Sequence, residues 1–131
     1  MLVAFVLCSA CTKGLSAEVF NNSALTLIVD VGGRKTNIAP QQFKRILLTS
    51  TSFEVQHGAL TWKYFPSLHA PQVISEEGHN ILDPAYVDKD DVIKVQIDVD
   101  GHIYILQRDQ NFPIQNKLAQ PPGYPLASSL F

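Results

Sequence analysis

Polar and apolar positions alternate along this chain in short runs, and glycine-containing turns separate the runs. The clearest pair of runs, 25–31 (LTLIVDV) and 34–38 (RKTNI), flanks a Gly-Gly dipeptide at 32–33. A two-residue Gly-Gly loop favours a type I′ or II′ turn, because glycine accepts the positive φ angles that these turns require. In that register Asp30 lies opposite Lys35 on one face, and the apolar side chains share the other face. The segment therefore predicts a β-hairpin.

A second hairpin is predicted where 53–57 and 60–65 flank a two-residue loop that begins at Gly58. This spacing sets Val55 opposite Trp62 and gathers the aromatic and β-branched side chains on one face. Cross-strand pairs of this kind contribute about 0.2–1 kcal/mol each, so several of them together define the register.

A third hairpin is predicted from 92–98 and 102–107. A two-residue loop would split the apolar residues of the two strands between opposite faces. A three-residue loop, with Gly101 in the left-handed conformation of a G1 bulge, keeps them together. In this register Asp98 faces His102, and we expect that pair on the solvent side.

With a further strand at 43–49, the chain contains about seven predicted strands in hairpin connectivity and no helical periodicity. This pattern predicts an all-β fold, a small antiparallel β-sandwich or a partly open barrel. The segment 66–91 lacks clear alternation and is interpreted as one long acidic loop. The last segment, 108–131, is rich in proline and is predicted to be an extended tail, either lying on the sandwich or free.

The first ten residues (MLVAFVLCSA) are almost wholly apolar. A run of this length is too short to cross a bilayer but is typical of the central region of a signal peptide. The triplet that ends at Cys11 resembles the end of a bacterial lipobox, in which the cysteine is lipidated; cleavage after Ala17 is the other option. We therefore predict an export signal or lipoprotein leader over 1–17 and a β-sandwich domain over 18–107. The expected location is the bacterial periplasm or outer membrane, or outside the cell.

Composition supports a packed domain and excludes some functions. Of the 131 residues, 46% are hydrophobic and 17% are charged, and the net charge is −2. A nucleic-acid partner is not expected, because phosphate binding needs an excess of cations. Two cysteines cannot make a disulfide-rich scaffold. The charge is uneven, because 1–65 carries a net +3 and 66–131 a net −5.

The acidic residues of the long loop suggest a contact surface. Their spacing is irregular, so the sequence defines no set of metal ligands. The carboxylates form either a solvated loop or a surface for a basic partner or a divalent cation. The six residues are Glu76, Glu77, Asp83, Asp88, Asp90 and Asp91.

The tail contains Pro121-Pro122-Gly123-Tyr124, which fits the P-P-x-Y motif that WW domains bind. A preformed polyproline II segment docks into an aromatic groove at low entropic cost. Such a domain would have to meet the protein in the cytosol. The other interpretation is that the Pro-rich tail covers an edge of the sheet.

Catalytic and cofactor motifs are missing from the sequence. The histidines do not show the H-x-x-x-H spacing of zinc sites, no serine lies in G-x-S-x-G, and no Gly-rich phosphate loop occurs. We predict no cofactor and no metal. If a chemical site exists, His69 and His79, which share the long loop with Glu76 and Glu77, are the first candidates.

The prediction from sequence is therefore an exported small β-sandwich that acts by binding a protein or glycan in the cell envelope, with no catalytic activity. It would touch the membrane only through a lipid on Cys11. An alternative is a cytosolic adaptor or viral-type protein that recruits a WW domain through Pro121, Pro122 and Tyr124. A third is a small envelope hydrolase, which the unexplained long loop leaves open.

Overall fold

The computed structural model describes residues 14–65 and 67–130, and the predicted lipidation site Cys11 lies outside them. Within these residues the regular structure is entirely β, with eleven strands in three sheets and no helix. The all-β prediction is confirmed. The strands are β1 (Ser16–Asn22), β2 (Leu27–Val31), β3 (Arg34–Ile38), β4 (Phe43–Leu47), β5 (Phe53–His57), β6 (Leu60–Tyr64), β7 (Gln72–Ile74), β8 (Asn80–Leu82), β9 (Val92–Asp98), β10 (Ile103–Leu106) and β11 (Ser128–Leu130).

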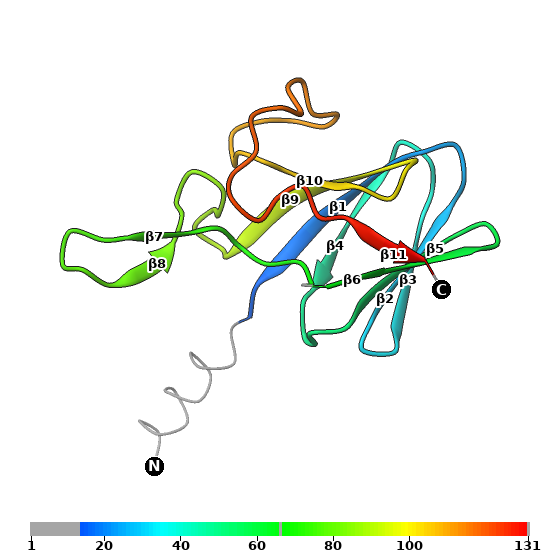
Figure 1. Ribbon diagram of the computed structural model, residues 1–131, viewed down its shortest axis with the longest axis horizontal. Coiled ribbons are helices and arrows are strands. Elements are labelled where there is room, and N and C mark those ends of the chain that lie inside the picture. Colours follow the sequence, from blue (N-terminus) through cyan, green and yellow to red (C-terminus); the bar gives the residue numbers. More distant parts are fainter. Residues whose placement is uncertain (1–13, 66, 131) are drawn as a thin grey trace, which may run out of the picture.

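Two larger sheets face each other across one hydrophobic core (Figure 1). The first has the strand order β10-β9-β1-β4 and the second the order β11-β6-β5-β2-β3; neither closes into a barrel. Val19 and Val95 of the first sheet and Leu27 and Val55 of the second are fully buried in the same cluster. Each large sheet turns its alternate side chains inward, as expected for a small β-sandwich.

The hairpins form in the predicted registers. In β2–β3 both loop glycines have positive φ, 60° for Gly32 and 93° for Gly33, as a type I′ turn requires. In β5–β6 Val55 pairs with Trp62. These registers depend on turn chemistry and on alternation within a dozen residues, and both features can be read from the sequence.

The β9–β10 hairpin has the predicted three-residue loop, with Ile97 opposite Ile103 and Gly101 at a φ of 85°. The predicted solvent position of Asp98 is wrong, since this residue is only 6% exposed. Its carboxylate accepts hydrogen bonds from Asn22 and Gln96 and contacts the Lys117 ammonium group. Lys117 belongs to the segment 107–118, which lies over the outer face of the first sheet, where Phe112 stacks on Phe20. We call this segment the strap. The contact of Lys117 with Asp98 helps to cover that aspartate.

Strand β1 was not predicted, although it occupies an interior position of its sheet. It pairs antiparallel with β4 and parallel with β9. The predicted start of the domain at residue 18 falls inside this strand. Its alternation is hidden because Asn21 takes a fully buried position. The Asn21 amide donates to the carbonyls of Leu25 and Ile38 at 2.7 and 2.9 Å, and these bonds offset the cost of burying a polar group.

The tail packs on the sandwich and covers its edges. The side-chain amide of Gln120 hydrogen-bonds both the N–H and the carbonyl of Ile105, as a neighbouring strand would. Leu126 forms a β-bridge with Ile103, and β11 adds to the edge of β6. Strand β10 therefore has partners along its outer edge, which protects it from pairing with another chain.

Candidate functional site

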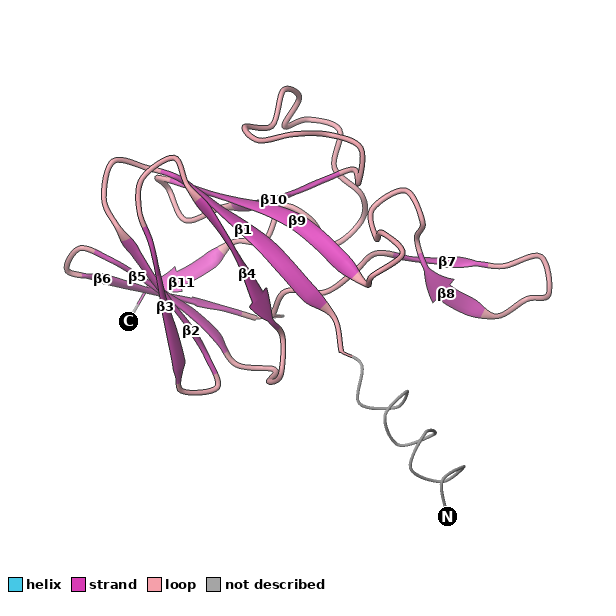
Figure 2. Ribbon diagram, turned by 180° about the vertical axis from the view of Figure 1, so that it is seen from behind, coloured by secondary structure: helices cyan, strands magenta, loops and turns pink. Residues whose placement is uncertain are grey.

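The long acidic loop contains a two-stranded hairpin, β7–β8, which extends away from both large sheets (Figures 1 and 2). We call this hairpin the arm. All six residues of its strands are exposed. The sequence offered a weak signal for it, because two apolar pairs flank a short turn that contains Gly78. Three-residue strands are too short for alternation to be recognised.

Both faces of the arm carry exposed aliphatic side chains. Val73 pairs with Ile81, so these two side chains share one face and are 37% and 43% exposed. Ile74 and Leu82 lie on the opposite face and are 67% and 38% exposed. Scattered single apolar residues are normal on protein surfaces, but here each face of one short hairpin carries two of them.

The arm also presents main-chain groups along its edges. Ser75 donates to the His79 carbonyl and Asp83 donates to the Pro71 carbonyl, both at 2.8 Å. In an antiparallel ladder the bonded pairs alternate, so every second residue turns its N–H and carbonyl outward. These outward residues are Gln72, Ile74, Asn80 and Leu82.

The structure divides the six predicted acidic residues into three pairs. Glu76 and Glu77 lie exposed in the turn at the tip of the arm. Asp83 and Asp88 instead accept hydrogen bonds from main-chain N–H groups, Asp83 from Ala85 at 2.9 Å and Asp88 from Asp90 and Val92. These two aspartates therefore stabilise the turns at the base of the arm. Asp90 and Asp91 follow in the loop before β9, where Asp90 is exposed and Asp91 is half-buried.

The P-P-x-Y motif of the tail is only partly accessible. Pro122 is exposed and Pro121 is half-buried, whereas the Tyr124 ring is 7% exposed. The Tyr124 hydroxyl donates to the His69 carbonyl at 2.6 Å, and the His69 ring packs on the tyrosine at 4.8 Å. A WW domain would reach this tyrosine only after the tail had left the sandwich.

His69 and His79 lie in different surroundings. His69 packs against Tyr124 on the sandwich, whereas His79 is exposed in the turn of the arm beside Glu76 and Glu77. Across 14–65 and 67–130, no group of three or more His, Cys, Asp or Glu residues is arranged to hold a metal ion. The same residues include no helix long and apolar enough to span a membrane.

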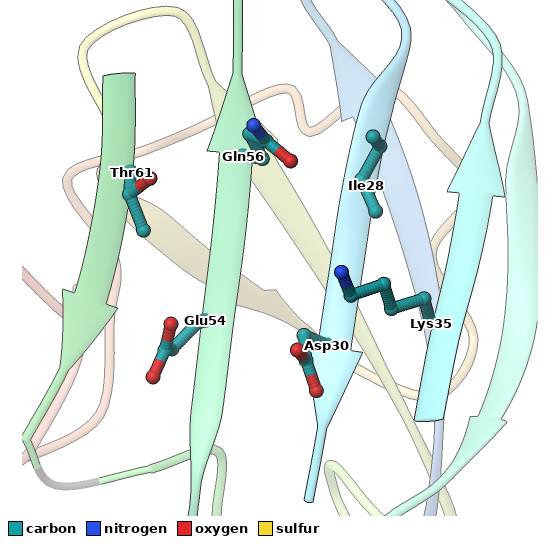
Figure 3. A pocket seen from close by; sticks show the side chains of 6 residues that line it. All are labelled: Ile28, Asp30, Lys35, Glu54, Gln56 and Thr61. Atoms are coloured by element: carbon teal, nitrogen blue, oxygen red, sulfur yellow. The ribbon is translucent and has the colours of Figure 1, made fainter. Parts of the chain in front are cut away.

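The outer face of the second sheet carries a shallow hollow of about 200 Å³ (Figure 3). Asp30 and Glu54 lie side by side on neighbouring strands at its floor. Each carboxylate faces a cation, because Asp30 is paired across the ladder with Lys35, and Glu54 lies 4.0 Å from the Lys63 ammonium. The charges on this face are balanced, and we assign it no ligand.

The arm is therefore the candidate site, with apolar faces, outward main-chain groups and an acidic tip on one projecting element. Comparison with protein-family models, with curated proteins and with solved structures gives no match.

Proposed function

We propose that this protein is an exported binding protein that acts without catalysis and holds a basic protein partner on its arm. The observation that carries the proposal is the exposure of four aliphatic side chains on a hairpin that stands apart from the core. An isolated two-stranded hairpin is marginally stable in water. Covering its side chains with a partner would contribute about 1 kcal/mol or more for each residue buried.

The main chain of the arm suits strand addition. Its outward N–H and carbonyl groups match those of an extended segment of another protein, and the side chains beside them supply specificity. The arm is short, so we expect the added strand to be short as well. Apolar residues of the partner would then cover Ile74 and Leu82 on one face or Val73 and Ile81 on the other.

The charge of this region favours a basic partner. Glu76 and Glu77 are exposed at the tip, and the chain has no Lys or Arg between Lys63 and Lys89. A negative arm steers a positive surface towards it and disfavours acidic proteins. We therefore expect binding to weaken as the salt concentration rises.

Photo-crosslinking in the source organism tests the proposed arm contact. A photoreactive residue in place of Ile74 is expected to capture one predominant basic protein. The same residue in place of Leu118, which is 95% exposed on the strap, is not expected to capture it.

The charge-reversed variant Glu76→Lys/Glu77→Lys should lower the affinity for the captured protein by about tenfold or more, while Asp109→Lys, on the exposed strap, should not. Equal capture at both positions, or equal effects of both charge changes, would contradict the proposal.

Export is the second part of the proposal, and the position of β1 supports one cleavage site over the other. Ala17 is fully buried and pairs with Ile46 and Ile93, so cleavage after it would remove two residues of an interior strand. Cleavage before Cys11 would leave β1 whole. We expect mass spectrometry of the protein from its native cell to find a lipidated Cys11 at the N-terminus. A chain that retains Met1 would exclude export by this route.

A further inference from the structure

A second pocket lies on the outer face of the first sheet, away from the arm. It has a volume of about 330 Å³, within the range of small-ligand sites. Strands β1 and β4 supply Glu18, Phe20 and Phe43, Gln41 precedes β4, and the strap supplies Asn111 and Phe112. Residues far apart in the sequence thus meet at one site that no motif revealed.

Three phenylalanine rings make the apolar part of this pocket. Phe112 stacks on Phe20, with ring centroids 4.9 Å apart and ring planes 8° from parallel. Phe43 lies 5.6 Å from Phe112 and is tilted by 40°. Phe20 is buried beneath this contact, whereas Phe43 is 51% exposed. The two outer rings therefore offer aromatic surface at an angle to each other, which a flat apolar face of a ligand can contact.

The strap that carries Phe112 is tied to the sheet below it. The Lys94 ammonium group donates to the carbonyls of Arg108 and Gln110 at 3.0 and 2.8 Å. On the far side of Phe112, the Ile114 N–H donates to the Gln96 side chain at 2.8 Å. Fixing the strap on both sides of Phe112 holds this wall of the pocket in place before a ligand arrives, which lowers the entropic cost of binding.

The charged groups of the pocket are already engaged. Glu18 accepts a hydrogen bond from Arg45 at 3.1 Å, and Lys94 is used by the strap carbonyls. An ionic ligand would therefore find no uncompensated charge to pair with. Two neutral amides have hydrogen-bonding groups left over. The Gln41 side chain uses only its nitrogen, which donates to Asn22, and the Asn111 side chain makes no hydrogen bond to any described residue. These groups can both donate to and accept from hydroxyls.

We infer that this pocket binds a neutral saccharide. A pyranose ring has an apolar C–H face, which suits Phe43 and Phe112, and a rim of hydroxyls, which suits Gln41 and Asn111 and the Glu18 carboxylate. A nucleotide or an anionic glycan would need free cations. A purely apolar ligand would leave the polar groups of the rim without partners. This inference does not depend on the arm, because the two sites share no residue.

A titration followed by amide NMR tests the inference, with the mature protein and four neutral probes: cellotetraose, chitotetraose, maltotetraose and xylotetraose. At millimolar concentration at least one of them should shift the amide signals of Phe43, Asn111 and Phe112 in a saturable way. Phe43→Ala should weaken that binding by about tenfold, and Phe43→Trp should retain it, because the larger ring keeps the stacking surface. Phe65→Ala is the matched control, since Phe65 is 98% exposed outside the pocket.

Several results would overturn the inference. These are saturable shifts with none of the four probes, binding only of tetragalacturonate as an acidic probe, or equal affinities of Phe43→Ala, Asn111→Ala and the unaltered protein. Because Phe43 is half exposed, its replacement should leave the fold intact, and the unchanged dispersion of the remaining amide signals verifies this in the same spectra. Failure here would leave the arm contact unaffected, because crosslinking at Ile74 reports on that site alone.

Discussion

Replacing Gly101 with alanine should lower the free energy of unfolding by about 3 kcal/mol, the sum of a strained backbone and a steric clash. Gly101 has a φ of 85°, where side chains other than glycine are disfavoured. A Cβ atom there would lie 2.8 Å from the Ser128 hydroxyl and 3.1 Å from two atoms of the Trp62 ring. The serine can rotate away, but Trp62 is packed in the core and cannot move freely. We expect the clash with the tryptophan to dominate.

Gly78→Ala is the matched control for this change. Gly78 has the same φ of 85°, but a Cβ atom at that position would have no neighbour within 4 Å. In Gly78→Ala the backbone strain alone should therefore lower the free energy of unfolding by about 1 kcal/mol. Urea denaturation of both variants measures the difference between them. Equal losses of stability in the two variants would show that the Trp62 ring moves to make room for the added methyl group, and would contradict the predicted clash.

Replacing Tyr124 with alanine should lower the free energy of unfolding by about 3–5 kcal/mol, as other deletions of buried aromatic rings do. The ring packs in the core cluster together with Leu126, and its hydroxyl holds the main chain at His69. Loss of the ring should also loosen the tail, so that the amides of β10 exchange faster with solvent. Denaturant titration and hydrogen exchange test both effects; a variant that is as stable as the parent protein would contradict the burial of this ring.

Tyr124→Phe removes the hydroxyl and keeps the ring, so it measures the contribution of the hydroxyl alone. It should lower the free energy of unfolding by only about 1 kcal/mol near neutral pH. Burial raises the pKa of Tyr124 to about 12 from its ordinary value of 10.0, and the hydrogen bond from the His69 main chain has a smaller, opposing effect. The stability that this tyrosine contributes is therefore complete below pH 10 and falls as the pH rises towards 12, because the unfolded chain releases the proton first. The phenylalanine variant should lose less stability over this range.

Part of the alkaline loss should persist in Tyr124→Phe, because burial also raises the pKa of Tyr64. A variant that loses as much stability as the unaltered protein between pH 10 and 12 would contradict the assignment to Tyr124.

Tyr124→Phe is also the appropriate variant for a test of WW binding. It keeps the tail in place, whereas Tyr124→Ala is expected to release it.

The elements that sequence reasoning predicted correctly are those whose causes are local. The turns at 32–33 and at Gly101 require positive φ angles, and glycine in the sequence at these positions therefore predicts them. The alternation of polar and apolar residues on either side then defines which side chains share a face. For β2–β3, β5–β6 and β9–β10 the observed registers agree with this reasoning. The chain closes these hairpins over short loops, so their pairing needs no information from distant residues.

The candidate sites were predictable only in part. Charge alone made Glu76 and Glu77 candidates for partner contact, but their position at the tip of a projecting hairpin was not visible in a segment without alternation. The aromatic pocket was missed altogether. Phe20, Phe43 and Phe112 are separated by 23 and 69 residues, and no spacing rule connects residues that meet through β1–β4 pairing and a strap.

By itself the sequence determined the all-β class, the three hairpins and the acidic character of the second half. The tertiary structure alone decided that β1 lies between β4 and β9, that Asp98 is buried, and that the tail completes the sheet edges. The physical reason is the same in each case. Each of these features depends on contacts between segments distant in the chain, such as the parallel pairing of β1 with β9, the contact of Lys117 with the buried Asp98, and the pairing of β11 with β6. Local alternation and turn chemistry carry no information about such contacts.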